Sequence, residues 1–433
     1  MRASFLTDQS RYRLRIWTGA LPGGCGKATR LPCPRAGCRT SYPPCLYPLS
    51  RPASPALTIT TPSFDAASQQ AGQSAAARAL PGRAADVRVG IWLVCVAVLI
   101  FAIILVGGAT RLTDSGLSIT EWAPIHGVIP PLTHDQWLAE FELYRQIPEY
   151  QIQNAGMSLA AFQFIYWWEW GHRLLGRVIG LAVLVPLVVF AATRQLRPGM
   201  AWPLGGIVLL VGLQGAIGWW MVHSGLSGER LDVAAYRLAT HLSMAFLLLC
   251  LVTWVALDHL APRQAAPGSG AAAVTGDRRV VPWAVALVAV LASQVVLGAF
   301  VAGTDAGFAH NDFPTIDGAW LPQEYARLDP LWRNWVENTQ AIQFNHRIGA
   351  MLAGAVAVAA FVVARRSPVQ TVRTLAAVML ALVIAQIALG IGTLHMFRYH
   401  APPDIAGVLT GVAHQGLGAL VMLASVLLLR AAR

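Results

Sequence analysis

Long apolar stretches alternate with short polar segments along most of the chain. Each stretch is close to the roughly 20 residues that an α-helix needs to cross the hydrocarbon core of a bilayer. The first contains the run IWLVCVAVLIFAIILVGG, which carries no charged residue. The pattern predicts an all-α membrane protein with eight transmembrane helices, at residues 89–110, 163–193, 201–223, 235–258, 282–302, 341–364, 372–396 and 405–430.

Composition and charge support a membrane location. The 433 residues are 55% hydrophobic and 12% charged, and the formal net charge is +11. The basic residues lie mainly at the ends of the apolar stretches, so the charge does not indicate a nucleic-acid partner. Arginines concentrate in segments 194–200, 259–281, 365–373 and 430–433, whereas the long connections 111–162 and 303–340 hold most acidic residues. Because basic loops stay on the cytoplasmic side, we expect both termini in the cytoplasm of a bacterial cell, the protein in its inner (plasma) membrane, and the two long loops outside.

Residues 1–88 differ from the rest of the chain. They are rich in Pro, Ser, Ala and Arg and show no apolar periodicity, which predicts a disordered tail; a start codon placed too far upstream is the alternative. Four cysteines lie in the tail at spacings that match no zinc-binding pattern: Cys25, Cys33, Cys38 and Cys45.

Several polar positions recur in the two halves of the apolar region. Four pairs of identical residues are separated by 172 to 174 positions: His172 and His346, Gln214 and Gln386, His223 and His395, and His241 and His414. The related segments TDSGL at 113 and TDAGF at 304 each follow the first helix of a half. An even number of helices per half gives both the same orientation. The sequence therefore predicts two tandem four-helix bundles, 89–260 and 282–430, related by a parallel repeat.

Four of the repeated histidines are candidate metal ligands. His172, His241, His346 and His414 lie at similar depth in their predicted helices, and a glycine or alanine follows each of them four residues later. Two facing imidazoles from one helix bundle can bind haem iron as axial ligands, and small residues leave room for a porphyrin. Hydrogen bonding between helices is the structural alternative, and zinc fits less well because it needs three or four clustered ligands. His223 and His395, at helix ends, are candidates for a haem edge or for the membrane interface.

Charged residues accompany two of these histidines. Arg173 and Arg347 could pair with haem propionates, or could extend to the membrane interface. Glu169 precedes His172 by three residues, whereas the matched residue in the second half is Gln343. A carboxylate at only one site suggests that this pocket performs proton-coupled chemistry and the other supplies electrons. A salt bridge between Glu169 and Arg173 or Arg177 is the alternative.

A Gln-x-x-x-Gly pattern occurs in three predicted helices, within the runs LQGAIG, SQVVLG and AQIALG. Small residues at this spacing allow helices to approach closely. We interpret the pattern first as a helix-packing feature.

Five segments together resemble the heme A synthase family: GGATRLTDSGLSITEW at 107–122, EWGHRLLGRVIG at 169–180, RLATHLSMAF at 237–246, QFNHRIGAMLAG at 343–354 and VAHQGLGAL at 412–420. The resemblance covers about residues 89–430. One subgroup of the family carries a cysteine pair in the first outward loop. This sequence lacks that pair and is similar to the mitochondrial and proteobacterial subgroup.

The resemblance implies a membrane oxidoreductase that converts a methyl group of haem O into the formyl group of haem A by successive hydroxylations. It implies a haem b cofactor bound by His346 and His414 in the second unit, substrate haem between His172 and His241 in the first, and Glu169 as the catalytic carboxylate. Haem O synthase and cytochrome oxidase assembly factors are expected partners, the electron donor is not identified, and a homo-oligomer is compatible with this reading. A two-haem b-type membrane electron carrier that oxidises quinol is the alternative function.

Overall fold

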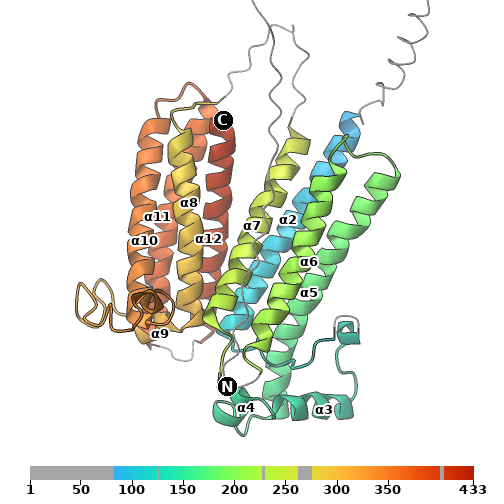
Figure 1. The fold of residues 1–433 in the computed structure, drawn as a ribbon, viewed down its shortest axis with the longest axis vertical. Coiled ribbons are helices and arrows are strands. Elements are labelled where there is room, and N and C mark those ends of the chain that lie inside the picture. The colour runs from blue at the N-terminus through green and yellow to red at the C-terminus, as the bar shows by residue number, and fades with distance from the viewer. Residues whose placement is uncertain (1–81, 124–125, 227–229, 262–275, 400–403) are drawn as a thin grey trace, which may run out of the picture. The chain divides into compact units, whose positions relative to one another are not determined.

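The computed structural model describes residues 82–123, 126–226, 230–261, 276–399 and 404–433. Within these ranges the chain is helical and contains no β-strand. The eight helices long and apolar enough to cross a membrane are α2 (Arg83–Leu112), α5 (Leu159–Ala192), α6 (Ala201–His223), α7 (Ala235–Leu260), α8 (Val281–Gly303), α10 (Thr339–Ala364), α11 (Gln370–Tyr399) and α12 (Ile405–Ala432). They confirm the predicted all-α membrane protein and its eight spans (Figure 1).

The first helix begins earlier than the sequence predicted. Residues 83–88 were assigned to the disordered tail, but they form the first turns of α2. Arg83 donates hydrogen bonds to the carbonyl oxygens of His259 and Ala261, at 3.0 and 2.7 Å, where the end of α7 leaves carbonyl groups without helical partners. Asp86 is buried and forms an ion pair of 2.8 Å with Arg197. These contacts account for the longer helix; residues 1–81, including the four tail cysteines, lie outside the described ranges.

The transmembrane helices form two groups of four. In the first group α2 contacts α5 and α7, and α6 contacts α5 and α7. In the second group α10 contacts α8 and α11, and α12 contacts α8 and α11. The groups meet where α7 packs on α8 and α12, and where α2 packs on α12 (Figure 1). This arrangement is compatible with the predicted tandem four-helix units.

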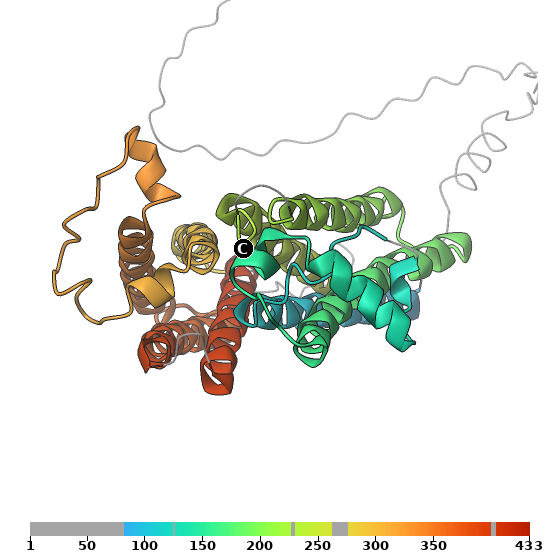
Figure 2. The same ribbon diagram turned by 90° about the horizontal axis from the view of Figure 1, so that it is seen from below.

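Short helices lie on one side of the bundle, which Figure 1 shows at the lower end and Figure 2 from below; we call it the long-loop side because segments 113–123, 126–158 and 304–338 are there. They are α3 (His134–Tyr144), α4 (Pro148–Ile152), α9 (Ala306–Ala309) and the 3-10 helices His126–Val128 and Leu331–Trp335. A capping box formed by Thr133 and Gln136 starts α3. The packing of Trp137 and Phe141 against Phe162 and Tyr166 holds α3 on α5.

Polar caps determine where several transmembrane helices begin on this side. The side chains of Ser158, Asn338 and Asp404 accept hydrogen bonds from backbone N–H groups in the first turns of α5, α10 and α12. His346 is consequently the eighth residue of α10 and His414 the tenth of α12. His172 is the fourteenth residue of α5, because α5 starts four residues before its predicted boundary and its first turns pack on α3.

Glu149 on α4 is a buried carboxyl group on the long-loop side. It is only 3% exposed, and Tyr144 donates to its Oε1 at 3.0 Å. Burial raises the pKa of Glu149 to about 8, although the Tyr144 hydrogen bond opposes this shift. The folded protein thus binds a proton that the unfolded chain, with a glutamate pKa of about 4.3, has already lost at neutral pH.

This difference predicts a pH-dependent stability. The contribution is fully present below a pH of about 4 and is lost as the pH rises to about 8, by at most about 1.4 kcal/mol per pH unit. We expect the Tm of the purified protein, followed by tryptophan fluorescence, to fall between about pH 5 and about pH 8, and Glu149→Gln to make this fall smaller. Glu142→Gln, which changes an exposed carboxylate on α3, is the control and should leave the slope unchanged. An unaltered slope in the Glu149 variant would contradict the assignment.

Candidate functional site

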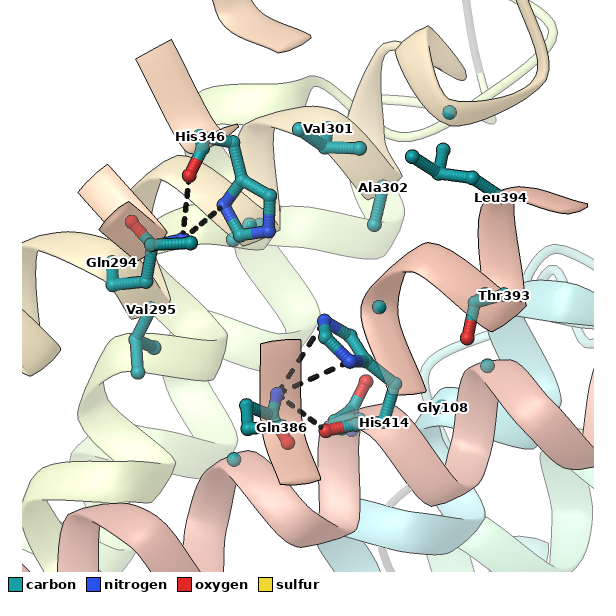
Figure 3. Close-up of a pocket in the computed structure, with 18 of the residues that line it drawn as sticks. Gly108, Gln294, Val295, Val301, Ala302, His346, Gln386, Thr393, Leu394 and His414 are labelled. Atoms are coloured by element: carbon teal, nitrogen blue, oxygen red, sulfur yellow. Dashed lines mark hydrogen bonds between the residues drawn. The ribbon is translucent and has the colours of Figure 1, made fainter. Parts of the chain in front are cut away.

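Two histidines of the second helix group face each other across a cavity. His346 on α10 and His414 on α12 have ring centres 6.5 Å apart and ring planes at 78° (Figure 3). With one metal atom between the rings, two metal–nitrogen bonds of about 2 Å each would place the two ligating nitrogens about 4 Å apart. The distance from each nitrogen to the centre of its own ring makes up the rest of the 6.5 Å. The two rings are therefore spaced to hold one metal atom between them.

The cavity that contains this pair has a volume of about 580 Å³, within the usual range for sites that bind organic cofactors. Its walls are largely apolar and come from α8, α10, α11 and α12, while Gly108 of α2 and Phe246 of α7 close one side. The polar residues in its lining include both histidines and Arg347. An apolar cavity with two opposed imidazoles and the Arg347 guanidinium suits a flat, carboxylate-bearing macrocycle; the other arginine of the lining, Arg111, is ion-paired with Asp305.

Glutamines from neighbouring helices contact three of the four candidate histidines. Gln294 on α8 donates to the backbone oxygen of His346 at 2.8 Å, and its Nε2 lies 3.0 Å from the ring Nδ1 (Figure 3). Gln386 on α11 contacts His414 in the same way, at 3.0 and 3.2 Å. In the first group, Gln214 on α6 contacts His241 at 3.1 and 3.2 Å. The amide in each case links the ring to its own backbone.

A glycine four residues after each glutamine lies against the same histidine ring. A Cβ atom added at Gly298 or Gly218 would come within 3.0 Å of Cε1 of His346 or His241. At Gly390 the corresponding distance to His414 is 2.8 Å. Only glycine leaves this space, so the Gln-x-x-x-Gly pattern positions a histidine as well as packing helices. The sequence interpretation was therefore incomplete, although the matched offsets of Gln214 and Gln386 with the histidines carried the signal.

The glutamine amides also show that the residues fit haem ligation. The Oε1 atoms of Gln214, Gln294 and Gln386 are buried and have no hydrogen-bond partner within the described residues. When histidine binds a metal through Nε2, its Nδ1 carries a proton and needs an acceptor. Exchange of the amide oxygen and nitrogen would bring Oε1 to Nδ1, in place of the hydrogen bond that Nε2 donates to the histidine backbone oxygen.

The first helix group holds the other histidine pair, His172 on α5 and His241 on α7. Glu169 lies one turn before His172 and is only 2% exposed. Its Oε1 accepts hydrogen bonds from Arg173 at 2.6 and 3.0 Å. Its Oε2 accepts from the Ser118 hydroxyl at 2.8 Å and from the Ile119 backbone at 2.7 Å. The carboxylate is therefore both ion-paired, as the alternative interpretation of the sequence foresaw, and tied to the loop that follows α2.

Arg173 extends this network to the loop backbone. It donates to the carbonyl oxygens of Ile119 at 2.6 Å and Glu121 at 3.0 Å. The network therefore fixes the segment after α2 over the end of α5. Ser118 was not among the residues selected from the sequence, because only the fold brings it to Glu169.

The second helix group has the matching arginine and loop contacts, but Gln343 stands where the first group has the carboxylate of Glu169. Arg347 donates to the backbone oxygens of His310, Asp312 and Thr315 at 3.1, 2.8 and 2.7 Å. Gln343, 1% exposed, donates to the same His310 oxygen at 3.3 Å. No carboxylate forms an ion pair with Arg347 among the described residues, and its Nε has no partner. Asp312 and Asp317 offset its charge only in part, without a direct ion pair, and its Nε stays unpaired beside the cavity.

The structure separates His223 and His395 from the cavity of the second group. Both side chains are exposed at the long-loop ends of α6 and α11. His223 packs on Trp219 with ring centres 5.7 Å apart. Neither residue lines the cavity around His346 and His414, and their assignment to a haem edge remains a prediction.

Comparison with known proteins identifies the family of the chain. The family described as "Cytochrome oxidase assembly protein" matches residues 90–426. A Heme A synthase of Chelativorans sp. (strain BNC1) is 49% identical over 335 residues, 77% of this chain and 88% of that protein. The Heme A synthase of Paracoccus denitrificans (strain Pd 1222) is 45% identical over 337 residues, 78% of this chain and 85% of that protein.

The fold and site define a multi-pass membrane protein with paired histidines suited to haem. Because these similarities reach 45% and 49% identity over most of both chains, the chain belongs to the heme A synthase family of cytochrome oxidase assembly proteins. It is an oxidoreductase of that family.

The glycine contact at His414 gives a prediction about haem binding. Gly390→Ala places a methyl group where the His414 ring lies, so the ring must move and we expect less bound haem, or a shifted haem spectrum, in the purified protein. Gly392→Ala, on the same helix with no atom within 4 Å of the added methyl, is the matched control and should retain the wild-type spectrum. The pyridine haemochrome assay measures the content. Equal haem content and spectra in the two variants would contradict the role given to this contact.

Proposed function

We propose that this member of the heme A synthase family oxidises a methyl group of haem O to the formyl group of haem A, and that its two helix groups divide the task. The first group, 89–260, holds the substrate haem between His172 and His241. The second, 282–430, holds a resident haem b between His346 and His414. The observation that supports this division is the carboxylate of Glu169 at one site and the amide of Gln343 at the matched position.

The resident haem b fits the second group on two grounds. The spacing of His346 and His414 suits two axial ligands, and Gln294 and Gln386 hold the rings. Arg347 lines the same cavity without a carboxylate partner, so it can bind a propionate by a charge-assisted hydrogen bond. When bound, haem b supplies a one-electron redox centre for the reaction.

Arg173 has a different role in this proposal. Its charge is already balanced by Glu169 in the ion pair of 2.6 Å. A propionate of haem O at Arg173 would compete with Glu169 for the guanidinium. Substrate binding would then release Oε1 of Glu169, which could accept or deliver a proton, while Ser118 and Ile119 keep Oε2 in place.

The reaction consists of two successive hydroxylations of one methyl group, each with dioxygen as the oxidant: one oxygen atom enters the methyl group, and the other leaves as water after the uptake of two electrons and two protons. The product of the second is a geminal diol, which loses water to give the aldehyde. Protons and electrons must reach the site in each cycle, and the protein contributes by positioning the substrate and excluding water. Of the two matched positions, 169 and 343, only the first carries an ionisable side chain, the carboxylate of Glu169.

The two-haem electron carrier is less well supported. It accounts for four histidines but gives no reason for a buried, ion-paired carboxylate at one site alone, and the related proteins are heme A synthases. We also propose the bacterial inner membrane as the location, with cytoplasmic termini and the long-loop side facing outward. Haem O synthase, cytochrome oxidase assembly factors and an electron donor are the proposed partners.

Expression in cells that make haem O but no haem A tests the function. Chromatography of extracted haems should show haem A with the wild-type chain, and at least about 100-fold less with Glu169→Ala, because a positioned proton-transfer group contributes about this much or more. Gln343→Ala is the matched control and should still yield haem A. No haem A from a folded, haem-loaded wild-type protein would overturn the enzyme assignment and favour the electron carrier.

A further inference from the structure

One of the four histidines, His172, differs from the other three in its contacts. His241, His346 and His414 each contact a glutamine that precedes a ring-packing glycine by four residues. The glycine that packs on His172 is Gly107 of α2, and the residue four positions before it is Ile103. No hydrogen bond reaches the His172 ring within the described part of the chain.

Ile103 occupies the place that a glutamine occupies in the second group. Its Cδ1 lies 3.6 Å from a Cβ atom added at Gly176, four residues after His172. The matching residues of the second half are Gln294 and Gly298, at the same offset as the segments TDSGL and TDAGF, and Gln294 contacts His346, the counterpart of His172. The difference is therefore local: a hydrocarbon side chain replaces an amide at the same place beside the histidine-bearing helix.

The His172 ring lies against its glycine much as the other three rings do. Its Nε2 is the atom closest to Gly107, at 3.2 Å from an added Cβ. At Gly218, Gly298 and Gly390 the closest atom is Cε1, and Nε2 is 3.6 to 3.9 Å away. A half-turn of the imidazole exchanges Nε2 with Cε1 and gives His172 the same order of contacts, so the missing amide is what distinguishes His172 from the other three histidines.

We propose that His172 is the displaceable axial ligand of the substrate haem and that His241 is its permanent ligand. This inference rests on the proposed function, since it requires haem O between the two histidines. An amide that bonds a ligating histidine fixes its ring and strengthens ligation, commonly by 10- to 100-fold in metal affinity. Ile103 can neither donate nor accept, so His172 lacks this support.

In this scheme the iron of the substrate haem has one axial position that can open, on the side of His172. Departure of the His172 ring frees the face of the substrate haem nearest its own helix, and Glu169 lies one turn away on that helix. Ile103 is a positioning residue in this scheme because it acts only through His172. The resident haem keeps both ligands, held by Gln294 and Gln386.

Carbon monoxide binding to the dithionite-reduced, haem O-loaded protein tests the proposal, because CO binds ferrous haem only where a ligand is absent or leaves. We expect one of the two haems in the wild type to bind CO. Ile103→Gln, which installs the missing amide, should weaken CO binding at this haem by about 10-fold or more. Gln294→Ile, the reciprocal change in the second group, should make the haem b site bind CO.

Removal of each ligand provides the second measurement. His172→Ala should keep haem O and bind CO at least as well as the wild type, whereas His241→Ala should lose haem O from the first group. The reverse pattern, or unchanged CO affinity in Ile103→Gln with low-spin haem b intact, would overturn the proposal. A wild-type protein that takes up haem b but no haem O would instead overturn the proposed function on which it rests.

Discussion

A histidine inside an apolar helix bundle finds hydrogen-bond partners only within the protein, because lipid offers none. For three of the four candidate histidines the partner is a glutamine amide on the adjacent helix, and a glycine one turn away on that helix makes room for the ring. This requirement sets how closely α8 approaches α10 and α11 approaches α12. The same contacts leave each ring beside a cavity lined by the helices it connects, so helix packing and ligand geometry have one physical cause.

The loops on the long-loop side depend on a related solution. Arg173 and Arg347 hold loop carbonyl oxygens over the ends of α5 and α10. Arg173 forms a direct ion pair with Glu169, whereas Arg347 has only the more distant charges of Asp312 and Asp317, although the backbone contacts of the two arginines are alike. A duplicated scaffold thus places a direct ion pair at one site and an arginine without one at the other. This difference can assign a proton-handling role to one half and a propionate-binding role to the other without a change of fold.

The two helix groups also share polar contacts. Arg111 at the end of α2 forms ion pairs with Asp114 at 3.0 Å and with Asp305, which follows α8, at 2.8 Å. Gln415, next to His414, donates to the backbone of Ile104 on α2. Residues of α2 therefore contact both His172, through Gly107, and the neighbour of His414. The position of one site is consequently coupled to that of the other through a single helix.

The sequence by itself determined the eight spans, the duplicated histidines and the singular Glu169, because hydropathy and repeat spacing are properties of the linear chain. It misjudged the start of α2, where Arg83 and Asp86 have partners on α7 and in the segment after α5 that the linear chain does not reveal. Tertiary structure alone decided that Gln294 meets His346, that Ser118 and Arg173 share Glu169, and that Ile103 stands beside His172. These contacts join helices and loops distant in sequence, and the strength of a hydrogen bond depends on distances that only packing sets.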